Sequence, residues 1–194
     1  MKKRLFFIGI FVVLIGISFY MFKNYFSDNS SSGFVVRDFD YNKDHQAVDN
    51  LFHKDDNWYW MISTQNTDTY SIDFALRYKT SSQHIKKQDM VLKVCLIDGK
   101  IAGFFSYYPK IQGSNKIWQL LFLIVDQDFR RQGIARKLLT SAVDDMVKRG
   151  AIRIDIATRN NNFRAQNLYK SFGAKLVDSD DGDFVHFSWY KPKL

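Results

Sequence analysis

The residues with the clearest chemical potential form the segment RRQGIAR at positions 130–136, between an apolar stretch and an amphipathic one. The first amides of a helix lack intrahelical acceptors and carry a partial positive charge, so a helix that begins here can bind a phosphate. Gly133 and Ala135 leave room for a diphosphate to approach the backbone, and three arginines add positive charge. The segment therefore predicts an anion-binding site, although an ordinary strand-to-helix turn has the same pattern.

A second segment of interest follows at positions 160–173, and it begins with polar residues. Three consecutive asparagines, residues 160–162, precede a short amphipathic segment that carries Tyr169 and ends at Gly173. Taken alone, a tyrosine on such a segment indicates a packing residue with a solvated hydroxyl. Its spacing from the asparagines gives it a second interpretation, because the whole pattern is that of a known family.

Together, the two segments resemble the GNAT superfamily of N-acetyltransferases. The donor-site pattern of that family is Arg or Gln, two residues, Gly, one residue, then Gly or Ala, and it appears here at positions 130, 133 and 135. The later family pattern, Asn-x-x-Ala-x-x-Leu-Tyr-x-x-x-Gly-Phe, is matched at five positions: Asn162, Ala165, Leu168, Tyr169 and Gly173. The sequence departs from the family at Gln127, where proline is usual, and at Ala174, where an aromatic residue is usual. The resemblance covers residues 121–174.

The resemblance implies an activity and a set of site residues. The activity is transfer of an acetyl or other acyl group from acyl-coenzyme A to the primary amine of a small molecule or peptide, by direct attack and without a metal. Backbone groups of Leu123 and Val125 are expected to bond the pantetheine arm and the acetyl carbonyl as an added strand does. Asn162 is expected to bond the cofactor arm, and Tyr169 to protonate the departing thiolate. The diphosphate is expected at seven consecutive residues: Arg130, Arg131, Gln132, Gly133, Ile134, Ala135 and Arg136.

The general base for the attacking amine is not evident from the sequence. Relatives often place a glutamate near the start of the strand before the donor segment, but residues 117–119 read IWQ. The base is then a water molecule or a residue of another element, with Tyr107 and His186 as weak candidates. His186 fits an ordinary strand histidine better. The acidic stretch 178–183 fits a solvated turn better than a loop that attracts a cationic amine.

These residues need a sheet and helices to position them, and the hydropathy pattern predicts both. Asp98 and Gly99 predict a hairpin turn, and Asp44 is the expected N-cap of the first helix of the domain. The order predicts one α/β domain over residues 34–194, a GNAT-like mixed sheet that is mostly antiparallel, with helices on both faces. Strands are expected at residues 34–39, 90–97, 100–108, 118–125, 152–157, 174–177 and 184–189, and helices at 44–52, 72–78, 131–149 and 163–172.

The first 33 residues are expected to form a separate membrane segment. Residues 5–22 contain no charged side chain, and as a helix these eighteen residues span roughly 27 Å, close to the ~30 Å hydrocarbon core of a bilayer. They predict a single-pass anchor within residues 1–26, followed by a polar linker at 27–33. A cleavable signal peptide is the alternative, which the length of the apolar run disfavours. Three basic residues before the span favour a domain outside, whereas acyl-coenzyme A is normally cytosolic, so the side of the membrane is left open.

Composition and charge narrow the function classes. At 46% hydrophobic and 16% aromatic residues, the 194-residue chain can bury a full core. The formal net charge is +8, but four of the basic residues lie before Asp28, and the mild excess that remains does not indicate nucleic acid binding. Cys95 is the only cysteine, so no intrachain disulfide can form, and its apolar neighbours predict a core position.

Two other interpretations stand beside the enzyme. A catalytically inactive acyl-coenzyme A-binding module at a membrane would keep the donor segment and lack the carboxylate base. A membrane structural protein that uses the fold only for contacts would bind no cofactor at all. Release of the coenzyme A thiol in the presence of a panel of amines separates these classes from an enzyme.

Overall fold

The computed structural model describes residues 33–54, 57, 90–112, 115–178 and 182–190. Within them, seven strands form one sheet in the order β1-β2-β3-β4-β5-β7-β6. All neighbouring pairs are antiparallel except β4 and β5, which are parallel. The mixed, mostly antiparallel sheet that the sequence predicts is therefore confirmed. Its strands are β1 (Val35–Asp38), β2 (Val91–Ile97), β3 (Lys100–Gln112), β4 (Asn115–Val125), β5 (Arg153–Arg159), β6 (Lys175–Asp178) and β7 (Phe184–Tyr190).

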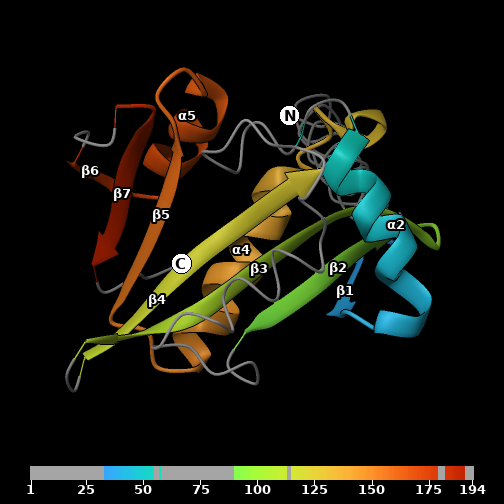
Figure 1. Ribbon diagram of the computed structural model, residues 1–194, viewed down its shortest axis with the longest axis horizontal. Helices are drawn as coiled ribbons and strands as arrows, with labels where there is room; N and C mark the ends of the chain where they lie inside the picture. The colour runs from blue at the N-terminus through green and yellow to red at the C-terminus, as the bar shows by residue number, and fades with distance from the viewer. Residues whose placement is uncertain (1–32, 55–56, 58–89, 113–114, 179–181, 191–194) are drawn as a thin grey trace, which may run out of the picture. The chain divides into compact units, whose positions relative to one another are not determined.

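Helices cover both faces of the sheet, as Figure 1 shows. On one face, α2 (Tyr41–His53) packs apolar side chains such as Phe52 onto a core built from β2, β3 and β4. On the other face, α4 (Ile134–Lys148) buries one continuous apolar stripe, and α5 (Phe163–Ser171) lies beside β5 and β7. Burial of such stripes is the main stabilising term of a fold of this kind. The stripe of α4 consists of Ile134, Leu138, Leu139, Ala142, Val143 and Met146.

The hairpin of β2 and β3 forms at the predicted turn. Asp98 and Gly99 adopt left-handed conformations, with φ values of 50° and 78°, as a two-residue turn of the I′ type requires. β3 continues to Gln112, beyond the predicted end at residue 108, because its outer half pairs with β4. Cys95 on β2 is completely buried, and burial raises the pKa of its thiol to about 11. The prediction of a core cysteine is confirmed.

The first cap of α2 differs from the prediction. Asp40, not Asp44, is the N-cap, and its side chain accepts a hydrogen bond from the amide of Asn42. Asp44 lies one turn inside the helix and is 2% exposed. Its carboxylate accepts bonds from the Arg37 guanidinium at 2.7 Å and from the Asp40 amide at 2.8 Å. A buried carboxylate needs such partners, so Asp44 fastens the helix to β1 instead of beginning it.

Other boundaries follow the predictions to within a few residues. The helix expected from residue 131 begins at Ile134, because Arg131 and Gly133 before it are left-handed. The helix expected near residues 72–78 and the anchor expected at residues 5–22 lie outside the described residues. No helix in the part of the chain that the structure describes is both long enough and apolar enough to cross a membrane.

Candidate active site

The two central strands of the sheet separate at a defined point. β4 and β5 are paired over four positions only, the last pair being Leu120 and Ile156, and they diverge beyond it (Figure 1). β4 carries an extra residue there, Leu121, because its register with β3 shifts between Ser106 and Tyr107. Such a bulge bends a strand and increases its twist. Among the described residues, the end of β4 therefore keeps its partner β3 and pairs with no strand along its other edge.

Leu123 and Val125 lie on this open part of β4. The amide of Asp126 donates to the carbonyl of Ala102 on β3 at 2.9 Å. Because the direction of amide groups alternates along an antiparallel strand, the backbone groups of Leu123 and Val125 point away from β3, toward the open edge. The carbonyl of Val125 already accepts a bond from Nε of Arg130, at 3.0 Å. The groups that an added extended chain can reach are those of Leu123 and the Val125 amide.

The loop from β4 to α4 presents a row of backbone amides. Within the described residues, no amide of residues 131–136 donates to an acceptor, and the first intrahelical bond runs from the Lys137 amide to the Gly133 carbonyl, at 3.1 Å. Arg131 and Gly133 are left-handed, with φ values of 62° and 77°. Gly133 is the N-cap and provides no side-chain acceptor, and a Cβ atom at this position would meet nothing within 4 Å. This is the geometry of an anion site at a helix N-terminus, and a diphosphate fits its donors.

Two of the predicted arginines hold the loop itself. Besides Val125, Arg130 binds Oδ1 of Asn57 at 2.9 Å, and Asn57 is 6% exposed. Arg136 donates to Oγ of Ser171 at 3.0 Å and lies over the ring of Phe172, which ties the first turn of α4 to the end of α5. By contrast, the side chain of Arg131 makes no hydrogen bond or ion pair among the described residues, and that of Gln132 donates only a long bond to the Asp128 carbonyl, at 3.4 Å. Among the exposed side chains of the loop, Arg130 and Arg136 therefore tie it to neighbouring elements, whereas Arg131 does not.

Asn162 is the N-cap of α5, and Tyr169 lies within this helix. Oδ1 of Asn162 accepts a bond from the Ala165 amide at 3.2 Å, so this side chain caps the helix. Tyr169 is 6% exposed, and its ring packs edge-on against Phe187 and Trp189. Its hydroxyl has no hydrogen-bond partner among the described residues, and burial raises its pKa above the usual value. A hydroxyl that stays protonated is suited to deliver a proton.

Comparisons with known proteins bear directly on this geometry. The profile of the Acetyltransferase (GNAT) family matches residues 46–174. The chain belongs to this family. The match includes the open end of β4, the donor loop at residues 130–136 and all of α5, so the elements described above are those that the family shares.

Individual relatives cover shorter stretches. The [Ribosomal protein bS18]-alanine N-acetyltransferase of Escherichia coli K12 is 39% identical over 76 residues, which is 39% of this chain and 49% of that protein. GCN5-related N-acetyltransferase 6, chloroplastic, of Arabidopsis thaliana is 35% identical over 68 residues, 35% of this chain and 24% of that protein. The chain thus spans half or less of the length of these curated relatives. The crystal structure of PaiA N-acetyltransferase from Thermoplasma acidophilum in complex with coenzyme A has a TM-score of 0.56 at 20% identity, and covers 81% of this chain and 99% of that one.

Tyr107, one of the two side chains considered as a base, is engaged elsewhere. Its hydroxyl donates to Oδ2 of Asp145 on α4, and burial together with this bond raises its pKa. Its ring stacks on Phe105 and touches Trp118, within the core between the sheet and α4. A proton acceptor must have a free acceptor atom at the substrate, and Tyr107 has a raised pKa and a committed hydroxyl. Tyr107 is therefore a structural residue of this family member.

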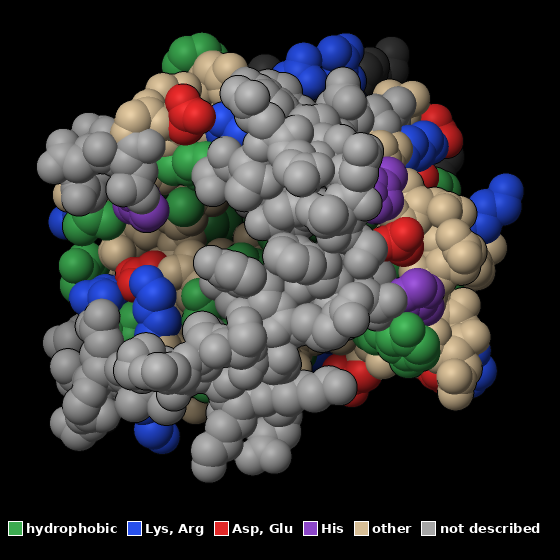
Figure 2. All heavy atoms as spheres, in the orientation of Figure 1, with side chains coloured by type: hydrophobic (Ala, Val, Ile, Leu, Met, Phe, Trp, Pro, Cys, Tyr) green, Lys and Arg blue, Asp and Glu red, His purple; other side chains and the backbone are tan. Residues whose placement is uncertain are grey.

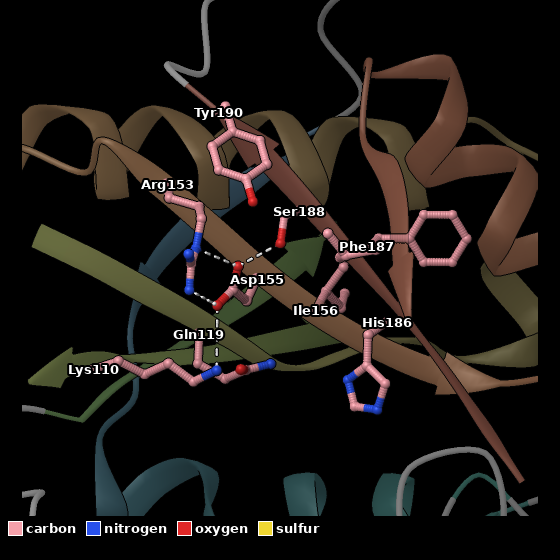
Figure 3. A pocket seen from close by; sticks show the side chains of 10 residues that line it. Lys110, Gln119, Arg153, Asp155, Ile156, His186, Phe187, Ser188 and Tyr190 are labelled. Carbon is pink, nitrogen blue, oxygen red and sulfur yellow. Dashed lines mark hydrogen bonds and ion pairs between the residues drawn. The ribbon is translucent and has the colours of Figure 1, made fainter. Parts of the chain in front are cut away.

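His186, the other candidate, lines a hollow on the face of the sheet opposite to α4. The hollow has a volume of about 200 Å³ and lies over β5 and β7, with further residues from β3, β4 and β6. On the face seen in Figure 2, a few basic and acidic side chains lie close together beside apolar ones. In Figure 3 the centre is taken by Asp155, and His186 stands apart from the group around that carboxylate.

Asp155 is the residue that sequence analysis missed. It pairs across the sheet with Gln119, which is one of the three β4 residues where relatives often have a glutamate and this chain has none. Its carboxylate accepts bonds from Oγ of Ser188 at 2.7 Å, Nη2 of Arg153 at 3.0 Å and Nζ of Lys110 at 3.2 Å. Burial raises the pKa of Asp155, but these partners outweigh burial and hold the pKa below its usual value. The only feature in the sequence that could have pointed to it was an acidic residue within the predicted strand at residues 152–157.

Proposed function

We propose that the chain transfers an acetyl group from acetyl-coenzyme A to an amine. The observation that carries the proposal is the row of amides at residues 131–136, which lack acceptors among the described residues and lie next to the open edge of β4. Family membership supports it, and so do the names of relatives, which are N-acetyltransferases, one of them in a complex with coenzyme A. A diphosphate linked to an extended arm is the ligand that these two neighbouring features fit.

The proposal gives each part of the site a role. The amides of residues 131–136 hold the diphosphate, while Arg130 fixes the loop through Val125 and Asn57. The backbone of Leu123 and the amide of Val125 bond the pantetheine arm. Acetyl-coenzyme A supplies an activated thioester, whose carbonyl carbon an amine can attack directly once both are held side by side.

Protons move at two places in this scheme. The attacking nitrogen must be a free amine, so it gives up a proton first. We assign this proton to solvent, because both oxygens of the Asp155 carboxylate beside the strand separation already accept hydrogen bonds. The departing thiolate takes a proton from the hydroxyl of Tyr169, whose raised pKa keeps it protonated at neutral pH. Asn162 keeps α5, and with it Tyr169, in place through its cap.

The direct test is release of the coenzyme A thiol. The full chain in mild detergent is mixed with acetyl-coenzyme A and a panel of small amines, polyamines and short peptides, and thiol release is followed over time. Amine-dependent release that continues beyond one equivalent supports an N-acetyltransferase. Tight binding of acetyl-coenzyme A without any release would identify an inactive binding module instead.

We further propose that residues 5–22 anchor the domain in a membrane. The support is the length and apolar character of this segment in the sequence. The expected result is that the full chain stays with membranes after extraction at high salt and alkaline pH, with its N-terminus intact by mass spectrometry. A soluble product that lacks the first residues would show a cleaved signal peptide.

A further inference from the structure

We propose that the hollow around Asp155 binds an acidic group of the acceptor, so that the acceptor is a small molecule with an amine at one end and a carboxylate at the other. This inference rests on the proposed transferase function and names the substrate class of that site. The residues that carry it are Lys110 on β3, Arg153 and Asp155 on β5, and Ser188 on β7.

The hollow lies beside the point where β4 and β5 separate. Asp155 pairs with Gln119, one position before the last pair of β4 and β5 and two positions before the bulge at Leu121. Its partner Ser188 alternates along β7 with Phe187 and Trp189, which pack against α5 on the other face. The hollow therefore opens on the face opposite to the donor helix, so an amine can approach the strand separation there without crossing the cofactor's path.

The charge of the hollow favours an anion. Asp155 looks at first like a site for a cationic amine, but Ser188, Arg153 and Lys110 already occupy its two oxygens. Two cationic side chains face this one carboxylate, which leaves one positive charge in excess (Figure 3). An approaching ammonium would meet Lys110 and Arg153, and would have to displace one of them from a carboxylate that is only 13% exposed.

Lys110 is the residue positioned to bind the acidic group. Its side chain is 34% exposed, and its ammonium group has three donors, of which Asp155 takes one. Asp155 holds the ammonium over the hollow, so less conformational entropy is lost when an anion binds than for a free surface lysine. Hydrogen bonds between an ammonium and a carboxylate are charge-assisted and among the stronger ones in proteins.

The dimensions limit the acceptor further. A hollow of about 200 Å³ suits a small molecule better than a folded protein segment. A strand rises about 3.3 Å per residue, so the level of Gln119 and Asp155 is roughly 7–13 Å from the segment Leu121 to Leu123. An acceptor that reaches from the hollow to the thioester therefore needs a chain of several carbons between its acidic group and its amine.

The experiment compares three acceptors of equal length. They are 6-aminohexanoate, its neutral amide and 1,6-diaminohexane, with 4-aminobutyrate and β-alanine as shorter acids. With the full chain in mild detergent and acetyl-coenzyme A as donor, we expect kcat/KM for 6-aminohexanoate to exceed that of the amide about tenfold, and that of the diamine by more. Lys110→Met should bring the ratio of acid to amide close to one, and Lys110→Arg should restore much of it. Lys100→Met, at the exposed start of the same strand, should keep the preference.

The results separate this inference from the proposed function. If the amide or the diamine is acetylated as well as the acid, the enzyme assignment stands and the acidic acceptor is wrong. If no compound is acetylated, calorimetry with the same three ligands decides. Binding that is selective for the acid and lost in Lys110→Met would keep the site and reject the activity, whereas absent or unselective binding would overturn the site as well.

Discussion

The donor loop and the hollow around Asp155 hold their polar groups in opposite ways. At residues 131–136 the backbone amides lack protein acceptors within the described chain, and no side chain caps the helix. At Asp155 every strong polar contact is already made inside the protein, by Ser188, Arg153 and Lys110. The loop presents backbone donors without acceptors. The hollow presents a carboxylate whose oxygens already accept hydrogen bonds from neighbouring side chains.

This difference suggests that the domain would recognise its two proposed substrates by different means, one by backbone groups and the other by side chains. The proposed cofactor site is built from backbone amides, which depend on conformation and on the absence of side-chain bulk. The proposed acceptor site is built from side chains, which vary freely without altering the strands that carry them. A substitution that adds bulk or charge should therefore be most harmful at the loop, whereas conservative side-chain changes should act more strongly at the hollow.

The largest expected effect is at Gly133. Gly133→Glu adds negative charge among the amides and forces a φ of 77° on a residue with a Cβ atom, so we expect affinity for acetyl-coenzyme A to fall more than about 100-fold. Gly133→Ala tests the strain alone, at about 1 kcal/mol of unfolding free energy, and should weaken binding far less. Calorimetry measures both variants. Equal affinity of Gly133→Glu and the native protein would remove the diphosphate from this loop.

The next effect concerns the hydroxyl of Tyr169 on α5. Tyr169→Phe should lower kcat about 100-fold while the dissociation constant for acetyl-coenzyme A changes little, because the ring packing with Phe187 and Trp189 is kept. Since the pKa of Tyr169 is raised, the native rate should not decline through this group up to about pH 10. The measurement is the pH profile of kcat for both proteins. Identical profiles would exclude Tyr169 as the acid.

A smaller effect should show whether Arg130 acts by positioning the loop or only by its charge. Arg130→Gln breaks the contacts with Val125 and Asn57, whereas Arg131→Gln removes an equal charge from a side chain that makes no hydrogen bond among the described residues. We expect about tenfold weaker binding of acetyl-coenzyme A for the first variant and about threefold for the second. If the two variants lose the same affinity, Arg130 acts only through its charge.

The smallest effect is on stability at low pH. The folded-state pKa of Asp155 is lowered, so its contribution is complete above the unfolded value of about 3.9 and is lost as the pH falls through the folded value. Asp155→Asn should lower the unfolding free energy by about 1 kcal/mol at pH 7 and flatten its decline below about pH 4. Asp128→Asn, at a carboxylate that is 69% exposed, serves as the control. Unchanged acid unfolding in Asp155→Asn would mean that the cluster contributes no net stability.

Local patterns in the sequence were sufficient for much of the fold and for the donor loop. The turn at Asp98 and Gly99 and the helix start beside Gly133 depend on conformations that glycine adopts without strain, so both are visible in a short window. Asp44 could be placed on a helix but not given its role, because its main partner, Arg37, lies on a separate strand. Whether a carboxylate begins a helix or fastens it to a sheet depends on tertiary packing.

The cluster around Asp155 could not be predicted for the same reason. Its members come from three strands, and β7 lies between β5 and β6, an order that hydropathy does not specify. The bulge at Leu121 was also invisible, because an extra residue in a continuously apolar strand leaves no mark on its pattern. Yet this bulge sets the point where β4 and β5 separate, and with it the place of the predicted chemistry.

The most direct test of the central claim is an NMR titration of the backbone amides. Coenzyme A and its phosphate-free fragment pantetheine are added in turn to the ¹⁵N-labelled full chain in detergent micelles. We predict that coenzyme A shifts the amide signals of residues 131–136 and of Leu123, and that pantetheine shifts Leu123 alone. Unchanged signals from residues 131–136 at saturating coenzyme A would contradict the claim that these amides bind the diphosphate.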